Sequence, residues 1–401
     1  MDYNEAVAYL NNLEQFGSQL GLSRIRPLLH KLSNPQDSLK CFHVAGTNGK
    51  GSVCAMISSI LQEAGYKVGM YTSPHLVDFK ERFLINNKKI SEADVAELAT
   101  RIKPLADEVA KEIGQVTHFE FITAMAFEYF KIQNVDYAVI EVGLGGRLDA
   151  TNVISKPFVS VITSIDLEHT DVLGNTIHEI AFEKAGIIKE KVPVVASAND
   201  EAYRIIKRIA DSEKSKVRRV AKKYNGLLGL QGDFQKSNAA VAAEAIKAAG
   251  IDIPSGKIAS GLEKAVWPGR IDLRSIRGKS VLFDSAHNPA GVRVLIPELK
   301  KFEFDRLILV ASILKDKDYK TMLNGLAPNA KLAILTRVNN LRTAEPLDLA
   351  KCITGYKIIA ANSADAVELA LAEAGKDDLI LVTGSIYLLG EAMSYLNAKV
   401  F

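Results

Sequence analysis

The sequence predicts an α/β protein of two domains, each built around a mainly parallel sheet. Short apolar runs rich in β-branched residues alternate with longer helical patterns along the 401 residues. Such alternation is typical of parallel sheets that are covered by helices on both faces. A break in the alternation near residue 270 divides the chain, whose length suits two or three ordinary domains.

The first domain is expected to span residues 1–272. Its predicted strands and helices alternate in order. The strands are expected at 42–45, 136–142, 158–164 and 192–196, and the helices at 52–64, 93–113 and 119–131. A Gly-rich turn follows the first of these strands and leads directly into a helix. This order predicts a P-loop-type domain, in which such a turn holds an anion.

The second domain is expected to span residues 273–401. Pro268 and Gly269 interrupt the helical pattern of residues 257–266, and such residues mark connections between elements. A fresh alternation follows, with strands predicted at 280–283, 307–312, 331–336, 357–360 and 379–383. About 130 residues are enough for a separate Rossmann-like α/β domain.

Composition excludes several classes of protein. The formal charge of +3 is small, whereas a dedicated nucleic-acid binder concentrates many basic residues on one face. Cys41, Cys54 and Cys352 lie far apart and form no C-x-x-C pair, which indicates neither a disulfide framework nor a zinc site. The N-terminus has no apolar signal segment, and no apolar run approaches the ~20 residues of a membrane span. A cytoplasmic protein without nucleic-acid or membrane partners is expected.

The Gly-rich turn is a candidate phosphate-binding loop. It runs from Phe42 to Ser52 with the sequence FHVAGTNGKGS. Its glycines let backbone N–H groups surround an anion at the start of the following helix. The pattern departs from G-x-x-x-x-G-K-[ST], since Val44 replaces the first glycine and Gly51 separates Lys50 from the hydroxyl residue. The ATP-binding candidates are Thr47, Asn48, Gly49, Lys50, Gly51 and Ser52.

Seven further segments follow in an order that matches one family. They read YTSPHL from Tyr71, THFEF from Thr117, EVGLGGRLDATN from Glu141, DLEHTD from Asp166, EKAGI from Glu183, PGR from Pro268 and FDSAHNP from Phe283. Together with GTNGKGS, these segments make the chain similar to the folylpolyglutamate synthase/dihydrofolate synthase family. That family is related to the Mur ligases of cell-wall synthesis, and the resemblance extends from about residue 20 to the end of the chain.

The resemblance implies a Mg²⁺ site at Ser73, Glu141 and His169. Each of the three follows or ends a predicted strand, which for Ser73 is the apolar run before Tyr71, at the sheet edge where open α/β sheets bind ligands. In the family a lysine that corresponds to Lys184 is often carbamylated, which would let it approach the metal as an anion. Its plain alternative is a solvated lysine. The expected catalytic residues are Lys50, His169 and Lys184.

The resemblance also implies contacts to the substrates. It assigns Asn238, Arg270, Asp284 and His287 to ATP, although His287 could instead cap a helix or form a turn before Pro289. The pterin of the second substrate is assigned to Thr117, His118, Phe119, Glu120 and Leu148. A basic stretch from Lys214 to Lys223 is read as a solvated face, with a steering patch for a polyanionic folate tail as its alternative.

The reaction implied by the resemblance is ATP-dependent amide formation. A carboxylate attacks the γ-phosphate of ATP, and L-glutamate then displaces phosphate from the acyl phosphate. Mg²⁺ and Lys50 would neutralise charge in the first step. The acceptor is dihydropteroate or a tetrahydrofolate, and a bifunctional enzyme is the default. A monomer is expected, because the family is often monomeric.

Three other functions stay open. A Mur-type cell-wall ligase shares the loop and the chemistry, but generally carries a further N-terminal domain, and only about 45 residues precede this loop. A P-loop ATPase or kinase would turn over ATP without glutamate or would accumulate a phosphorylated product. A non-catalytic nucleotide-binding module is disfavoured by the presence of Lys50, Glu141 and His169.

Overall fold

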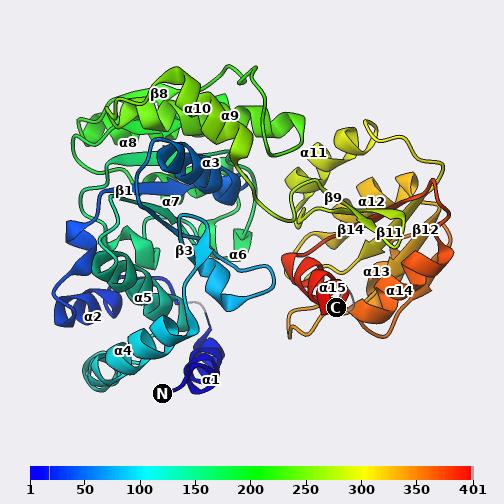
Figure 1. Ribbon diagram of the computed structural model, residues 1–401, viewed down its shortest axis with the longest axis horizontal. Helices are drawn as coiled ribbons and strands as arrows, with labels where there is room; N and C mark the ends of the chain where they lie inside the picture. Colours follow the sequence, from blue (N-terminus) through cyan, green and yellow to red (C-terminus); the bar gives the residue numbers. More distant parts are fainter. Residues whose placement is uncertain (18, 399–401) are drawn as a thin grey trace. The chain divides into compact units, whose positions relative to one another are not determined.

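The computed structural model describes residues 1–17 and 19–398 and divides the chain into two compact units. Unit 1 contains residues 1–75, 79–229 and 235–266, and unit 2 contains residues 76–78, 230–234 and the chain from residue 267 onward. Each unit has its own sheet with helices against it (Figure 1). The two-domain α/β fold predicted from the sequence is therefore confirmed.

The sheet of unit 1 has the strand order β4-β3-β2-β5-β1-β6-β7-β8. Its strands are β1 (Cys41–Ala45), β2 (Val68–Tyr71), β3 (Phe83–Ile85), β4 (Lys88–Lys89), β5 (Tyr137–Glu141), β6 (Val159–Ile162), β7 (Val194–Ala196) and β8 (Val217–Arg219). All neighbouring pairs are parallel from β2 to β8, and the antiparallel β3 and β4 extend one edge. β1 is central and fully buried.

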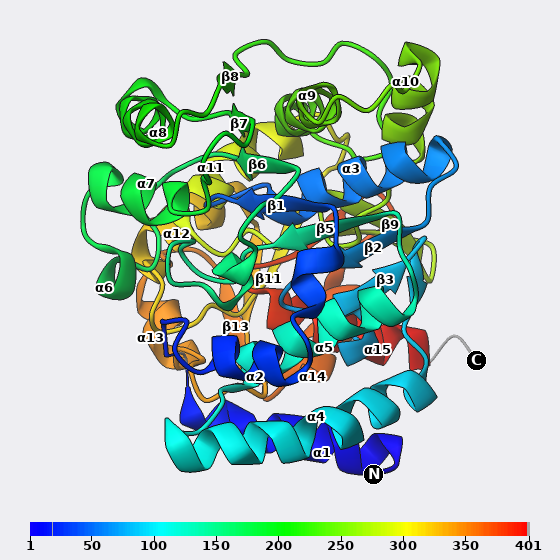
Figure 2. The same ribbon diagram turned by 90° about the vertical axis from the view of Figure 1, so that its left-hand side faces the viewer.

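Helices cover both faces of this sheet. They are α1 (Tyr3–Leu13), α2 (Ile25–Lys31), α3 (Lys50–Glu63), α4 (Glu92–Glu112), α5 (His118–Ile132), α6 (Thr170–Leu173), α7 (Ile177–Ala185), α8 (Asp200–Ser212), α9 (Asp233–Ala248) and α10 (Ser255–Lys264). α1, α2, α4 and α5 share one apolar core below the sheet, whereas α3 lies on the opposite face with α9 and α10 near it (Figure 2). α3 is buried nearly all round, with residues 51–61 all buried, because it packs against both the sheet and α10.

The register of the central strands brings the candidate loops to one edge. Val44 of β1 pairs with Glu141 of β5, and Ala45 pairs with Ile162 of β6. β2 ends beside β5, since Tyr71 pairs with Ile140. The carboxyl ends of four parallel strands therefore meet at this edge, which is where open α/β sheets bind ligands.

The sheet of unit 2 has the order β13-β12-β11-β14-β10-β9. Its strands are β9 (Asp272–Ile276), β10 (Lys279–Phe283), β11 (Leu307–Ala311), β12 (Leu332–Leu335), β13 (Lys357–Ile359) and β14 (Leu379–Thr383), and its helices are α11 (Pro289–Leu299), α12 (Tyr319–Leu326), α13 (Pro346–Lys351), α14 (Ser363–Glu373) and α15 (Ile386–Ala398). Two apolar cores lie on the two faces of this sheet, as the prediction of a covered parallel sheet requires.

Sequence patterns missed the short strands at the sheet edges. β3, β4 and β9 are antiparallel to their neighbours and partly exposed, so they lack the continuous apolar run that marks a buried parallel strand. The helix after the phosphate loop begins at Lys50, two residues before the predicted start. No helix among the described residues is long and apolar enough to span a membrane.

Candidate active site

The phosphate loop is attached firmly to the loop that follows β6. Gly46 has a φ of +150°, and a Cβ on it would lie 1.8 Å from the Thr163 hydroxyl oxygen, so only glycine fits there. The N–H of Thr47 donates to the carbonyl of Ser164 at 2.7 Å. The hydroxyl of Thr47 also contacts the backbone of Asp166 at 3.1 Å. These bonds fix the position of the loop at the start of α3, the place where a helix N-terminus attracts an anion.

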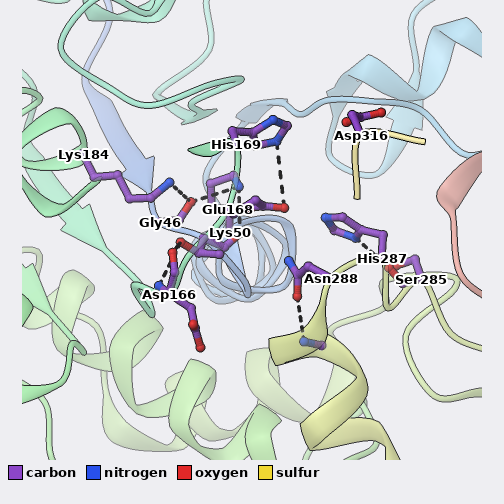
Figure 3. Close-up of polar contacts among 12 residues, drawn as sticks. Gly46, Lys50, Asp166, Glu168, His169, Lys184, Ser285, His287, Asn288 and Asp316 are labelled. Atoms are coloured by element: carbon purple, nitrogen blue, oxygen red, sulfur yellow. Dashed lines mark hydrogen bonds and ion pairs between the residues drawn. The ribbon is translucent and has the colours of Figure 1, made fainter. Parts of the chain in front are cut away.

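Two lysine side chains converge on this loop. Lys50, the first residue of α3, donates to the carbonyl oxygens of Gly46 and Thr47 at 3.1 Å each. Lys184, from the end of α7, donates to the same Gly46 oxygen at 2.9 Å. Figure 3 shows the two amino groups pointing at this carbonyl from different elements. The sequence places these lysines 134 residues apart, and only the fold brings them together.

Lys184 is not the solvated lysine of the plain alternative, because only 3% of it is exposed. Burial, and after it the positive charge of Lys50, lower its pKa to about 7, against the raising effects of Glu168 and Asp149. The amino group of Lys184 is therefore partly neutral near pH 7. A neutral amine is a nucleophile, which a solvated ammonium is not.

The depressed pKa predicts that stability depends on pH through Lys184. Between pH 7 and the unfolded pKa of about 10.4, the unfolded chain binds a proton that the folded chain does not. The free energy of unfolding should therefore rise with pH across this window, by at most about 1.4 kcal/mol per pH unit from this group. Lys184→Met should lose this rise, whereas the exposed Lys191→Met should keep it. Urea unfolding of both variants from pH 7 to 9.5, in CO₂-free buffer, checks the expectation.

Glu141, the last residue of β5, lies beside Ser73, which follows β2. Glu141 is 5% exposed, and its Oε2 accepts the backbone N–H of Ser73 at 3.1 Å. The carboxylate shares a sheet face with Val44, since the two residues are paired across β1 and β5. That face is the one against which α3 packs. Two of the three predicted metal ligands are thus adjacent.

His169 comes from the loop after β6 and precedes the short helix α6. Its backbone is left-handed, with φ 51° and ψ 44°, a conformation that costs a residue with a side chain some energy. Its Nε2 lies 3.9 Å from Oε1 of Glu168, a residue only 8% exposed (Figure 3). Sequence reasoning did not single out Glu168, although it stands inside the DLEHTD segment.

The residues at this edge fit a divalent metal that retains other ligands. Among the described residues, no three His, Cys, Asp or Glu side chains form a group that could hold a metal alone. A carboxylate, a hydroxyl and an imidazole from Glu141, Ser73 and His169 are too few to enclose an ion. Mg²⁺ typically binds in this way, through one or two carboxylates together with waters and substrate phosphates.

A second group of polar side chains reaches the loop from α9. Asn238 lies against Gly49, because a Cβ on Gly49 would be 2.6 Å from its Oδ1. Gln235, completely buried, donates to the Ser52 hydroxyl oxygen at 3.2 Å. Asn238 and Ser52 were both predicted to contact ATP, and each forms a hydrogen bond with the side-chain amide of Gln235. Gln235 itself was missed, since a glutamine in a helical pattern carries no local signal.

Two of the predicted pterin contacts build the start of α5. Thr117 caps the helix and forms a capping box with Glu120. The Oε2 of Glu120 also accepts from the Arg24 side chain at 3.0 Å, and the carboxylate is 3% exposed. Thr117 and Glu120 are thus buried and engaged with protein groups. This arrangement anchors the segment after Gly21 to the helix start, and Gly21 in turn donates to the carbonyl of Leu148 at 3.0 Å.

The other predicted pterin contacts are more open. His118 and Phe119 are partly exposed, and Phe119 packs on Gly143, where a Cβ would meet the ring at 2.4 Å. Burial and the charge of Arg82 lower the pKa of His118 to about 3, so its imidazole is neutral. Arg82 donates to Nδ1 of His75 at 3.0 Å in the same region. Neutral rings and an aromatic face suit a flat heterocycle.

A buried chain of polar groups supports the Gly-rich segment after β5. Asp149 accepts from the N–H of Leu144 at 2.9 Å and from the Thr151 hydroxyl at 2.5 Å. Thr151 also contacts Nε2 of His43 on β1 at 2.8 Å. Burial raises the pKa of Asp149 and lowers the pKa of His43 to about 3. Sequence reasoning gave Asp149, Thr151 and His43 no role, although Asp149 and Thr151 lie within a segment that carries the resemblance.

Unit 2 contains the remaining predicted ATP contacts. Asp284 is 4% exposed, and its two oxygens accept the N–H groups of Ile271 and Ala286 at 3.0 Å each. Its pKa is raised by burial, against a lowering effect of Arg270. His287 contacts the carbonyl of Ser285 at 2.9 Å. The side chain of the next residue, Asn288, caps α11. His287 is therefore not the cap.

Comparison with known proteins assigns the chain to a family. Residues 44–242 match the Mur ligase middle domain, and residues 269–386 match the Mur ligase glutamate ligase domain. The chain is 37% identical over 422 residues to the dihydrofolate synthase/folylpolyglutamate synthase of Bacillus subtilis, with 97% of this chain and 98% of that protein covered.

Solved structures agree with this assignment. Escherichia coli FolC in complex with DHPP and ADP superposes with a TM-score of 0.90 at 30% identity, covering 99% of this chain and 98% of that chain. A bifunctional folylpolyglutamate synthase/dihydrofolate synthase with Mn, AMPPNP and L-glutamate bound gives a TM-score of 0.87 at 30% identity, with 98% of both chains covered. The chain belongs to the dihydrofolate synthase/folylpolyglutamate synthase family, an ATP-dependent branch of the Mur ligases.

Proposed function

We propose that this protein is an ATP- and Mg²⁺-dependent ligase that joins L-glutamate to dihydropteroate and also extends the glutamate tail of a tetrahydrofolate. The observation that carries the proposal is the convergence of Lys50 and Lys184 on Gly46, within the phosphate loop. The positive charge of Lys50 suits a reaction that develops charge on a transferred phosphoryl group, and the Lys184 amine is bonded to the same Gly46 carbonyl. The bifunctional activity is supported by the B. subtilis relative, which carries both names.

In the first step the substrate carboxylate attacks the γ-phosphorus of ATP, and the bond to the β-phosphate oxygen breaks. The products are an acyl phosphate and ADP. We assign to Lys50 the stabilisation of charge on the phosphoryl oxygens, because its amino group already lies over the loop. The N-terminus of α3 supplies further positive potential for the phosphates.

Ser73, Glu141 and His169 are proposed to hold Mg²⁺. The metal would supply charge neutralisation for the phosphates, which is its usual part in such sites. Glu141 suits this role because it is a buried carboxylate at the strand end, with one oxygen already oriented by the Ser73 N–H. The solved relative described above has Mn bound. That this chain uses Mg²⁺ instead is also part of the proposal.

In the second step the amine of L-glutamate attacks the acyl carbon and gives up one proton, and phosphate leaves with its electron pair. The predicted contacts to ATP in unit 2 are still Arg270, Asp284 and His287. The predicted contacts to the pterin are still Thr117, His118, Phe119, Glu120 and Leu148. Within that set, the partly exposed His118 and Phe119 are the better candidates for direct contact, since Thr117 and Glu120 are engaged with each other and with Arg24.

We further propose that Lys184 carries a carbamate. The neutral amine would attack CO₂, form an N–C bond and release one proton. A pKa of about 7 favours this reaction, because an ordinary lysine is almost fully protonated at neutral pH. With ¹³C-bicarbonate, the NMR spectrum should contain a carbamate carbonyl signal that Lys184→Met lacks. The exposed Lys191→Met should retain the signal, and a spectrum without it in the native protein would contradict the carbamate.

Phosphate release from Mg-ATP tests the function. Release that requires L-glutamate together with dihydropteroate identifies the first activity, and release with glutamate and a tetrahydrofolate identifies the second. Release without glutamate would favour a P-loop ATPase or kinase. Release with neither pterin, but with another acceptor carboxylate, would favour a different amino-acid ligase.

We also propose that the protein acts in the cytoplasm and that it is a monomer. Sedimentation velocity of the purified chain checks the monomer, and an active dimer would contradict it.

A further inference from the structure

A chain of three polar side chains connects α9 to the phosphate loop. Gln235 is 0% exposed, and both ends of its amide have a partner. Its Nε2 donates to the hydroxyl oxygen of Ser52 on α3 at 3.2 Å. Its Oε1 accepts from Nδ2 of Asn238, three residues later on α9, at 2.8 Å. A buried amide with both ends bonded is held in one orientation.

This orientation determines what the two partners offer to a ligand. Because Gln235 donates to Ser52, the Ser52 hydroxyl keeps its own hydrogen for another acceptor. Because Gln235 accepts from Asn238, the carbonyl Oδ1 of Asn238 points away from Gln235. If the Gln235 amide turned over, Ser52 would donate its hydrogen to Gln235, and Asn238 would present its NH₂ group to the ligand in place of its carbonyl. One buried amide thus sets the direction at both ends.

The two ends suit different parts of a nucleoside triphosphate. The Asn238 carbonyl lies beside Gly49, 2.6 Å from where a Cβ on that residue would be, and Asn238 is only partly buried. Phosphate oxygens at neutral pH are acceptors, so a carbonyl cannot bond to them. The hydrogen-bond donors of ATP are the adenine amino group and the ribose hydroxyls. The Ser52 hydroxyl, by contrast, has a hydrogen suited to a phosphate oxygen.

We propose that Gln235 is a positioning residue that orients Asn238 and Ser52, and that it thereby selects a nucleotide with a donor on its nucleoside half. Gln235 acts through these two side chains and does not itself touch the nucleotide. The inference rests on the proposed ATP-dependent function.

Two substitutions separate the two ends of the chain. Gln235→Met has a similar volume but removes both hydrogen bonds, so Asn238 is free to turn over. When ionised, Gln235→Glu offers acceptors only, so the Asn238 carbonyl stays directed at the ligand while Ser52 gives its hydrogen to the carboxylate. The Met variant should therefore lose nucleoside selectivity, and the Glu variant should keep it while binding the phosphates more weakly.

The experiment measures the Kd of ATP, inosine triphosphate, 2′-deoxy-ATP and adenosine on the full chain with Mg²⁺. Inosine lacks the amino donor, and the deoxynucleotide lacks one ribose donor. In Gln235→Met the preference for ATP over one of these analogues should fall by roughly three- to tenfold, the usual effect of one net hydrogen bond. In Gln235→Glu that preference should remain, and the affinity for ATP should fall while the affinity for adenosine does not.

Gln62→Met is the matched control. Gln62 also donates an amide hydrogen bond to a serine, Ser58, at 2.8 Å, and both residues lie on α3, the helix that carries Ser52. The selectivity of Gln62→Met should equal that of the native protein. A Gln235→Met variant that binds ATP with the native preference over both analogues would overturn the inference, as a merely structural glutamine leaves the ratio unchanged. A native protein that binds no ATP would instead refute the proposed function. Melting temperatures of all variants identify any that fail to fold. If Gln235→Met fails to fold, Gln235→Glu alone provides the test.

Discussion

Replacing Lys50 by methionine is expected to lower kcat for phosphate release by roughly 10²- to 10³-fold. Loss of one preorganised group that stabilises developing charge typically has an effect of this size. The amino group lies 3.1 Å from two carbonyl oxygens of the phosphate loop, and methionine retains the length of the side chain without its charge. The KM for the pterin should change little, because Lys50 is assigned to the phosphates alone.

The same substitution should raise the pKa of Lys184. The charge of Lys50 is one of the causes that lower it, after burial. The rise of stability with pH should then begin at a higher pH in Lys50→Met than in the native protein. Steady-state kinetics and urea unfolding on the same samples check both effects. Lys88→Met, at an exposed position of β4, is the control, and equal kinetics of the two variants would contradict the role of Lys50.

Replacing Glu141 by glutamine is expected to lower activity by roughly 10²-fold or more at millimolar Mg²⁺, since a neutral amide is a much weaker ligand for a hard cation. The fold should survive, because the amide oxygen of glutamine can still accept the Ser73 N–H that Glu141 accepts at 3.1 Å. Excess Mg²⁺ should restore part of the activity. A loss that Mg²⁺ cannot relieve would point to a role other than metal binding.

Activity against Mg²⁺ concentration separates these outcomes. The native protein and Glu141→Gln should reach half-maximal activity at clearly different concentrations of the metal. Glu92→Gln, at the exposed start of α4, should match the native curve. Identical metal dependence of all three proteins would remove Glu141 from the proposed site.

Local patterns were enough to find the phosphate loop and the strand ends around it. A strand, a Gly-rich turn and a helix are adjacent in sequence from Cys41 to Glu63, so periodicity and turn chemistry determine them without the rest of the chain. The carboxyl ends of parallel strands must meet at one edge. The neighbourhood of Ser73 and Glu141 therefore followed once the strands were recognised.

The sequence by itself determined the two-domain α/β fold, the loop at the start of α3 and, through the resemblance, the family. Only the tertiary structure decided which of these residues act on one another. Gln235 reaches Ser52 across 183 residues, and Glu120 reaches Arg24 across 96. Lys184 has the local pattern of a surface helix, yet it is buried against Gly46 with a pKa of about 7. Burial and charge–charge effects depend on what packs against a side chain in space, and no local spacing specifies those neighbours.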